Sequence, residues 1–400
     1  MFRQRFIFPA ILMVVFVLPS FITSTNKGSY PAMPEDTTFV TLLFAGDVMG
    51  HDGQINGARD SLGKYNYDTC FSFVKTIIGS ADVAVANLEV TLAGGPFSGY
   101  PQFSSPDELA LALKKAGFDV LATANNHTCD KGLKGVNRTI AVLDSFQIQH
   151  TGSYVDSVSC NSTNPLIINK KGFTIALYNY TYGTNGIAPP KPSIVNRIDS
   201  MRILSDLQKS LKQCVDLKIV FFHWGNEYQT YTSLYQQNFC NWAYNCGADM
   251  VIGSHPHVVQ PATINNDSIQ QQLTVYSMGN FISDQRTHPR DGGMMVSIKL
   301  ARAAGRTRVA EAGYYLTWVY TPRVKGVKKH IILPLSRFET DTAFFSNAAD
   351  FRKMLRYSNT ARNVLRKAPN AIGEYLWNPE TCEWKLSYQQ APEQDTSRVE

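Results

Sequence analysis

The sequence is poor in charged residues and has neither an internal repeat nor a low-complexity tract. Charged residues make up 18% of its 400 residues and hydrophobic residues 44%. This balance is typical of a packed globular protein and argues against long disordered segments. A chain of this length can form one large domain or two of medium size. The seven cysteines are an odd number whose spacings match no small disulfide framework, so we expect most of them to be buried apolar groups.

Only one stretch of the chain is strongly apolar. Arg3 and Arg5 precede the run FIFPAILMVVFVLPSFI, which Pro9 and Pro19 interrupt and which neither an A-x-A cleavage site nor a lipid-accepting cysteine follows. We predict that residues 1–25 are a signal peptide or an N-terminal membrane anchor. The rest of the chain is then extracytoplasmic, in the periplasm or at the cell surface. The alternative is a buried N-terminal helix, but such a helix would have no polar face.

After this segment, strand and helix patterns alternate. The runs TFVTLLFAG and ADVAVANLEV are continuously apolar, which is typical of strands buried on both faces. SSPDELALALKKAG predicts a helix, with proline at its first position, acids in its first turn and glycine at its end. The order is βαβα at first and mostly β later, which predicts an α/β protein with more than one sheet.

The pattern changes at about residue 335. The segment DFRKMLRYSNTARNVLRKAPNAIGEYLW is typical of an amphipathic helix that ends at Pro369, and no chemical motif is found in it. We therefore predict a leader at 1–25, an α/β domain at 38–334 and a helical C-terminal extension at 335–400.

Five of the apolar runs end in polar side chains that can bind metal ions. Because the strands of an open α/β sheet end at one crevice, we expect these side chains to meet there. Histidines, carboxylates and amides suit zinc, manganese, iron or nickel, and no set of cysteines competes with them. The residues at the five ends are Asp47; Asn87 and Glu89; Asn125, Asn126 and His127; His223; and His255 and His257.

His255 and His257 lie on either side of Pro256. In an extended segment, residues i and i+2 point to the same face, so the two imidazoles would bind neighbouring ions. Pro256 cannot donate a hydrogen bond within a sheet, which suits the point where a strand leaves its sheet. The alternative interpretation is a polar loop that happens to contain two histidines.

Six motifs make the chain similar to a known family. FAGDVMG, ANLEVTL, TANNHTCDKG, FFHWGNEY, GSHPHVVQP and YSMGNF span residues 44–281. They stand in the order of the CapA family, the bacterial capsule-synthesis proteins linked to poly-γ-glutamate, which resemble calcineurin-like metallophosphoesterases. The resemblance implies a four-layer α/β/β/α sandwich of the metallophosphoesterase type. It also implies a site along one edge for one or two divalent ions, manganese, zinc or iron.

The resemblance implies six metal ligands and two candidate catalytic residues. His127 resembles the histidine that faces the substrate and can protonate the leaving oxygen, and Asn125, in the same motif, is the second candidate. The metal ligands are Asp47 and His257 at a first ion, Asn126, His223 and His255 at a second, and Glu89 between the two.

The sequence departs from the phosphoesterase pattern in two places. Where phosphoesterases have D-x-H, this chain has Asp47-Val48-Met49, and a thioether does not replace imidazole at a hard metal ion. His51 could curl back to fill that place. Glu89 stands where phosphoesterases have an aspartate, and its side chain is one methylene longer. Occupancy by one ion and occupancy by two ions both remain open.

Three functions fit these observations. The first is an extracytoplasmic metal-dependent hydrolase, of phosphoesters or of another ester or amide bond, associated with capsule or poly-γ-glutamate synthesis and export. The second is a non-catalytic accessory protein of capsule export that binds the anionic polymer, with membrane-bound synthesis proteins as partners. The third is a metal-dependent nuclease. That function rests on fold analogy and a basic segment, so nucleic acid is not the expected partner.

The basic segment covers residues 299–330, where eight lysines and arginines stand against Glu311 alone. It predicts one of two surfaces. The first is a basic face that meets an anionic polymer or the membrane, and the second is a solvated hairpin with dispersed charge.

Overall fold

Two β-sheets lie face to face in the structure, a computed structural model that describes residues 36–210, 214–266 and 271–388. In these residues the larger sheet has ten strands and the smaller has six. The strand order of the larger sheet is β20 (Glu383–Ser387), β19 (Gly373–Asn378), β15 (Arg306–Tyr320), β14 (Gly292–Ala303), β1 (Thr38–Val48), β2 (Val83–Leu88), β3 (Val120–Ala122) and β4 (Gln149–Thr151), with β13 (Asn280–Ile282) beside β1 and β18 (Ile331–Pro334) beside β15. The order of the smaller sheet is β11 (Ala262–Asn266), β12 (Gln271–Val275), β10 (Met250–Ser254), β9 (Leu217–His223), β7 (Phe173–Thr181) and β6 (Leu166–Lys170).

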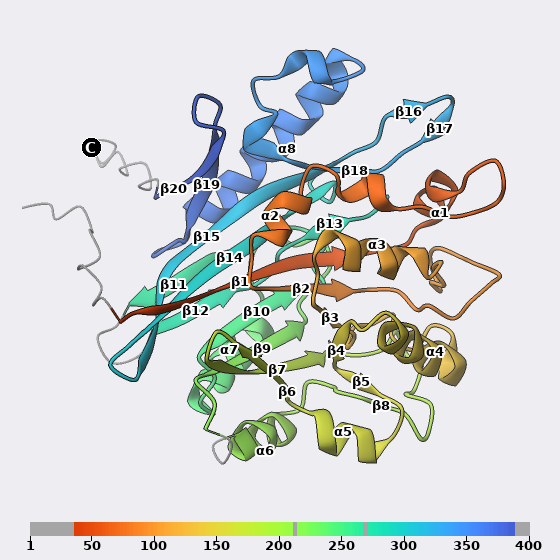
Figure 1. The fold of residues 1–400 in the computed structure, drawn as a ribbon. Helices are drawn as coiled ribbons and strands as arrows, with labels where there is room; N and C mark the ends of the chain where they lie inside the picture. The colour runs from red at the N-terminus through yellow and green to blue at the C-terminus, as the bar shows by residue number, and fades with distance from the viewer. Residues whose placement is uncertain (1–35, 211–213, 267–270, 389–400) are drawn as a thin grey trace, which may run out of the picture.

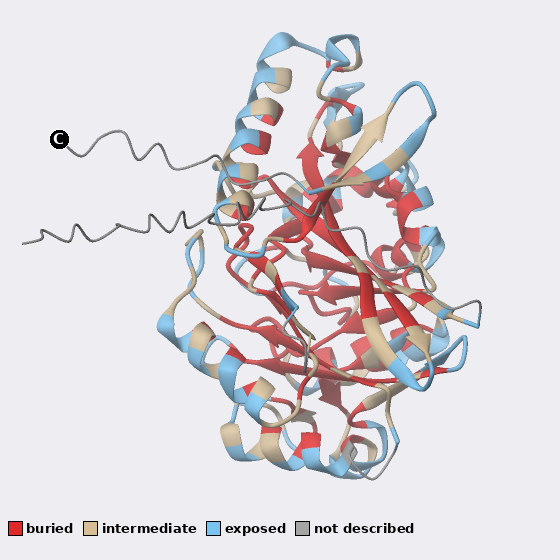
Figure 2. Ribbon diagram, turned by 90° about the vertical axis from the view of Figure 1, so that its left-hand side faces the viewer, coloured by how far each residue is buried: buried red, intermediate tan, exposed pale blue. Residues whose placement is uncertain are grey.

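Helices cover the outer faces of both sheets, so the strands are buried between them (Figure 2). The larger sheet packs against α2 (Lys75–Gly79), α3 (Glu108–Ala116) and α4 (Gly132–Ser145), and the smaller against α6 (Ser200–Ser210) and α7 (Leu234–Asn245). In β7, Leu177 faces the opposite sheet, whereas Tyr178 and Tyr180 pack beneath the helices. Both faces of such strands are apolar, which explains the continuous apolar runs. The predicted four-layer α/β/β/α sandwich is confirmed.

Shorter elements complete the structure around these layers. The remaining helices are α1 (Asp52–Ala58), α5 (Ser157–Thr163) and α8 (Ala348–Arg366). Two small two-stranded sheets lie outside the two large ones. The first pairs β5 (Ser153–Tyr154) with β8 (Ile194–Val195), and the second is the hairpin of β16 (Arg323–Val324) and β17 (Val327–Lys328).

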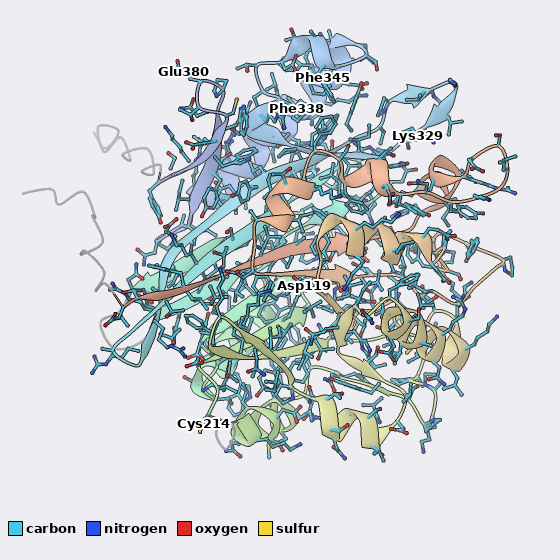
Figure 3. All side chains as sticks on the ribbon, in the orientation of Figure 1. Asp119, Cys214, Lys329, Phe338, Phe345 and Glu380 are labelled. Atoms are coloured by element: carbon cyan, nitrogen blue, oxygen red, sulfur yellow. The ribbon has the colours of Figure 1, made fainter. Side chains whose placement is uncertain are left out.

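The prediction of a helical extension at 335–400 was incomplete. Helix α8 forms and packs on the inner face of β15, next to Phe338 and Phe345 (Figure 3), but the chain then returns as the hairpin β19–β20 and joins the larger sheet. Tyr375 of β19 stacks on Tyr315 of β15, with ring centroids 4.5 Å apart. These strands are short and their pairing depends on contacts with a distant strand, so the local pattern did not reveal them.

The basic segment at 299–330 does not form one surface. It runs the length of β15, whose 15 residues extend about 50 Å. At one end of the segment Arg302 forms an ion pair with Asp216 at 3.3 Å, and at the other end Lys329 donates to the carbonyl of Gly57 beside α1 (Figure 3). This arrangement favours the dispersed-charge alternative.

The predicted leader at 1–25 lies outside the described residues. Within the described ranges, none of the helices has the length and apolar character needed to cross a membrane.

All seven cysteines are free thiols, and four of them are buried, Cys70, Cys129, Cys160 and Cys240. The expectation that most cysteines are buried apolar groups is confirmed.

Arg362 of α8 connects the C-terminal hairpin to the rest of the fold. Its guanidinium donates to Glu339 and Glu374, at 2.6 Å in each case, and the side chain of Glu374 is only 2% exposed. We predict that Arg362→Ala lowers the free energy of unfolding by about 3–5 kcal/mol, because a buried carboxylate loses its closest cation. Lys353→Ala, which removes an exposed ion pair from the same helix, should cost less than about 1 kcal/mol. Urea denaturation of the two variants measures the difference, and equal losses would contradict the prediction.

Candidate metal centre

The candidate ligands gather where parallel strands of both sheets end. Strands β1, β2 and β3 run parallel in the larger sheet, and β9 and β10 run parallel in the smaller. Their carboxyl ends open on one side of the sandwich (Figure 1). Asp47 stands at the end of β1, Glu89 directly follows β2, and His223 is the last residue of β9. The structure thus brings together side chains that are far apart in the sequence.

Close backbone packing positions two of these strand ends. Gly46 precedes Asp47, and a Cβ at Gly46 would collide with the carbonyl oxygen of Gly279. That carbonyl accepts a hydrogen bond from the backbone N–H of Asp47 at 3.0 Å. In the same way, a Cβ at Gly253 in β10 would collide with the carbonyl of Tyr276. Glycine is therefore required beside both ligand-bearing ends, because only it allows this approach.

Glu89 lies at the centre of the cluster. Its Oε1 is 3.5 Å from Nε2 of His223 and 3.7 Å from Nε2 of His257. Oδ2 of Asp47 is 3.0 Å from Nδ1 of His257, and Oδ1 of Asn126 is 2.7 Å from Nε2 of His223. All five side chains are buried. Five of the six predicted ligands therefore lie within a single contact network.

Two groups of side chains can each hold a metal ion. Their ligand atoms all lie within 4.8 Å of one another, in Asp47, Glu89 and His223 and in Glu89, His255 and His257. Both groups share Glu89, which suits the predicted position between two ions. The division of the other ligands differs from the one that the resemblance implies, because Asp47 groups with His223.

The unpaired atoms of the cluster indicate the kind of group that fits it. Oε1 of Glu89 and Nδ1 of His255 are buried and have no hydrogen-bond partner in the described part of the chain. Burial and the charge of Asp47 raise the pKa of Glu89 well above its usual value. Burial lowers the pKa of His223 to about 3 and that of His255 well below its usual value. Neutral imidazoles and a carboxylate without a counter-charge are satisfied by a divalent cation.

Neighbouring side chains orient the ligands. Nδ1 of His223 is 2.9 Å from Oγ of Ser254, which leaves Nε2 directed at the cluster. Asn87 donates its amide to Oδ1 of Asp47 at 2.9 Å and lies 3.3 Å from Oε2 of Glu89. Burial raises the pKa of Asp47, but hydrogen bonding and charge interaction with His257 outweigh it, so the net shift is downward. The sequence predicted Asn87 only as one of the potential ligands at the strand ends, and the structure gives it this orienting role.

The predicted geometry of the His255–His257 pair was wrong. Strand β10 ends at Ser254, and the backbone at both histidines is left-handed, with φ of 100° at His255 and 57° at His257. Their rings approach within 6.0 Å because the chain turns, not because an extended strand presents both on one face. Left-handed non-glycine residues cost about 1–3 kcal/mol each and concentrate at functional sites. Asp47 helps to hold this turn by accepting from the backbone N–H of His255 at 3.4 Å.

His127 stands beside the cluster and lines a cavity of about 450 Å³. Its Nδ1 is 2.8 Å from Oδ2 of Asp130, which also accepts from the backbone N–H of Phe103. The ring edge of Phe103 packs against His127 with centroids 4.6 Å apart. One ring nitrogen is therefore fixed by a carboxylate, and Nε2 is left for a ligand. Asp130 was missed in the sequence, although its spacing of three residues from His127 is a signal for such a pair.

Asn125 was predicted beside His127 as a candidate catalytic residue, but its side chain is fully used within the protein. It donates to the carbonyl of Leu88 at 2.7 Å and to Oδ1 of Asn87 at 3.2 Å. Its own Oδ1 accepts from the backbone N–H of His127 at 3.1 Å. The structure thus places Asn125 behind the site, where it holds the loop that carries His127.

His51 does not join the ligands of the metal groups. Its Nδ1 lies 3.2 Å from Oε1 of Gln54 and accepts from the backbone N–H of Asp284 at 3.3 Å. Met49, which stands at the D-x-H position, is buried with 2% exposure. The place of the missing imidazole is therefore not taken by His51 in this structure.

Two solved structures are similar to this chain in outline. The NAD nucleotidase of Haemophilus influenzae has a TM-score of 0.45 at 9% identity, and the match covers 83% of this chain and 61% of that one, less than two thirds of its length. The calcineurin-like phosphoesterase YfkN of Bacillus subtilis has a TM-score of 0.40 at 13% identity, over 82% of this chain and 99% of that one.

Two relatives are similar in sequence. The capsule biosynthesis protein CapA of Bacillus anthracis is 26% identical over 297 residues, 71% of this chain and 70% of that protein. The PGA biosynthesis protein CapA of Bacillus subtilis is 26% identical over 316 residues, 74% of this chain and 77% of that protein. Residues 41–285, more than half of the chain, match the family described as bacterial capsule synthesis protein PGA_cap. The protein therefore belongs to this family of bacterial capsule synthesis proteins.

Proposed function

We propose that the protein is a metal-dependent hydrolase of phosphoesters that acts outside the cytoplasm in capsule or poly-γ-glutamate synthesis or export. The observation that carries the proposal is the buried, unpartnered Oε1 of Glu89 between His223 and His257. Relatives that are named for capsule and PGA biosynthesis supply the biological setting. The partners in this setting are an anionic polymer or a phosphoester substrate and membrane-bound synthesis proteins.

Two parts of the site have separate tasks in this proposal. The ligands around Glu89 hold one or two divalent ions, of manganese, zinc or iron, whose charge lowers the pKa of water and offsets charge on a phosphoryl oxygen. His127, held through Nδ1 by Asp130, presents Nε2 to the leaving oxygen and can transfer a proton to it. The cavity that His127 lines receives the rest of the substrate and limits the access of water.

One observation favours a second function. Met49 stands where phosphoesterases have a ligand histidine, and His51 is engaged elsewhere. A site with one ligand fewer would suit a non-catalytic accessory protein that binds the polymer during capsule export. We do not propose a nuclease, because the cavity beside His127 has no lysine or arginine in its lining, and binding to nucleic acid depends on such side chains.

Metal content and turnover should separate in two histidine variants. We predict that His257→Ala loses most of the bound metal and all turnover, because the imidazole contacts both Asp47 and Glu89. His127→Ala should keep the metal complement of the wild type and lose turnover about a hundredfold to ten-thousandfold. Metal analysis after reconstitution and assays on a phosphoester panel provide the two measurements.

The matched control for these variants is His150→Ala, which removes a histidine that pairs with Asp144 and lies outside the metal groups. Wild-type metal content in His257→Ala would contradict the metal centre. Wild-type turnover in His127→Ala would contradict the role of that ring. If the loaded wild type hydrolyses no member of the panel, the accessory function replaces the hydrolase.

Glu89→Gln should separate folding from metal binding. A carboxyl whose pKa is raised in the folded protein destabilises it above the unfolded-state pKa of about 4. Without metal, we therefore predict that Glu89→Gln melts at or above the wild-type temperature at pH 7, with a gain that shrinks as pH falls towards 4. Added Mn²⁺ or Zn²⁺ should raise the melting temperature of the wild type and not that of the variant. Equal metal-induced shifts in thermal denaturation would contradict the assignment of Glu89.

Export can be tested with a fusion. A reporter that is active only outside the cytoplasm, joined after residue 40, should be active, because the arginines that precede the apolar run favour an inside N-terminus. The same reporter on a chain without residues 1–25 is the control and should be silent. Silence of both fusions, at equal protein levels, would overturn the extracytoplasmic assignment.

A further inference from the structure

The cavity beside His127 has a chemical character of its own. It holds about 450 Å³ and opens next to Asn126, which is one of the candidate ligands. Its polar lining includes the amides Gln102 and Asn185 and the carboxylate of Glu227. No lysine or arginine belongs to the lining, and every lining residue lies in the described part of the chain. A substrate group that occupies this cavity therefore meets amides and carboxylates, and neither lysine nor arginine.

Two carboxylates, Glu227 and Asp130, belong to the lining of the cavity. Oδ2 of Asp130 is engaged by His127 and by the backbone of Phe103, whereas its Oδ1 is buried without a hydrogen-bond partner in the described residues. Glu227 is exposed at the mouth of the cavity. A negative group on the substrate would thus meet charge of the same sign in this lining.

The nearby cation Arg290 lies outside the lining of the cavity. The guanidinium carbon of Arg290 lies 3.4 Å from the ring centroid of Tyr228, and neither residue belongs to the cavity lining. The amide of Asn185 is itself part of the wall, because its Oδ1 accepts from Asn126 at 3.2 Å. Tyr100, which is 73% exposed at the rim, adds an open aromatic face on which the carbon skeleton of a ligand can pack.

We propose that the leaving group of the substrate carries hydroxyl or ammonium donors and no negative charge, and that Glu227 selects for it. The inference deepens the proposed hydrolase function and rests on it. Hydroxyl and ammonium groups donate hydrogen bonds to carboxylate and amide oxygens, whereas a carboxylate or a second phosphate would be repelled by Glu227. A polyol, a sugar or an amino alcohol fits the cavity, and a run of glutamate carboxylates or a nucleic acid strand does not.

The test compares three small phosphoesters of similar size on the metal-loaded full-length protein. Glycerol phosphate supplies a hydroxyl leaving group, phosphoethanolamine an ammonium and phosphoglycolate a carboxylate. We expect kcat/KM for the first two to exceed that for phosphoglycolate at least tenfold. Glu227→Gln should reduce the preference for phosphoethanolamine over phosphoglycolate about tenfold, mainly through KM. Glu227→Gln should reduce the preference for glycerol phosphate over phosphoglycolate by a smaller factor. This difference distinguishes recognition of an ammonium group from recognition of a hydroxyl group.

Glu380→Gln is the matched control, because Glu380 is an exposed carboxylate in the turn between β19 and β20, separated from β1 by β14 and β15 (Figure 3). It should leave all three ratios unchanged. Preference for phosphoglycolate, or equal ratios in Glu227→Gln and wild type, would overturn the inference while leaving the hydrolase in place. If no compound is hydrolysed, the hydrolase proposal fails, and calorimetric binding still tests the cavity. In that case we expect glycerol phosphate and phosphoethanolamine to bind at least tenfold more tightly than phosphoglycolate. If they do not, the inference about the cavity fails as well.

Discussion

A carboxylate buried without a counter-charge is the constraint on which the site depends. Oε1 of Glu89 lies between the imidazole of His223, which burial keeps neutral, and the imidazole of His257, which already pairs with Asp47. No protein hydrogen bond reaches this oxygen in the described residues. Removing such a group from water is costly unless a partner compensates. Because strands β1 and β2 also bring Asp47 to the same place, the fold concentrates negative charge there. A divalent cation would resolve this conflict, and the sandwich provides the rigid frame that keeps the candidate ligands together.

The frame works because the ligands sit at the ends of strands that are packed on both faces. Leu42 and Phe44 of β1 and Phe221 of β9 belong to the core between the sheets, so the positions of the strand ends follow from apolar packing. Hydrogen bonds from Asn87 and Ser254 then fix the orientation of individual ligands. The strained turn at His255 adds the last ligands, which the two sheets alone would not bring into place. Apolar packing therefore sets the positions of the strand ends, hydrogen bonds orient single side chains, and the strained turn places the remaining ligands.

The sequence predicted the parts of this arrangement that depend on local pattern. Apolar runs that end in Asp47, Glu89 or His223 are visible in the letters, and the crevice rule brings them together without knowledge of the sheet order. The turn at His255 could not be derived in this way, whereas the position of Glu89 between two ions was implied by the resemblance to a known family. The bond between Asp130 and His127, which stand only three residues apart, was overlooked in the sequence. The turn at His255 was not accessible, because a strand pattern encodes neither backbone angles nor contacts between residues that are distant in the chain. The hairpin β19–β20 was missed for the same reason, since β15 supplies its partner.

The central claim is that an ion occupies the place beside Glu89, and anomalous diffraction tests it most directly. Crystals of the protein grown with Mn²⁺ or Zn²⁺ should show an anomalous peak at about 2.0–2.2 Å from Oε1 of Glu89, with nitrogen atoms of the cluster histidines completing its coordination. One peak would correspond to a single ion and two peaks to a pair bridged by Glu89. A map with no peak at this place, in crystals whose protein is otherwise folded as described, would contradict the account.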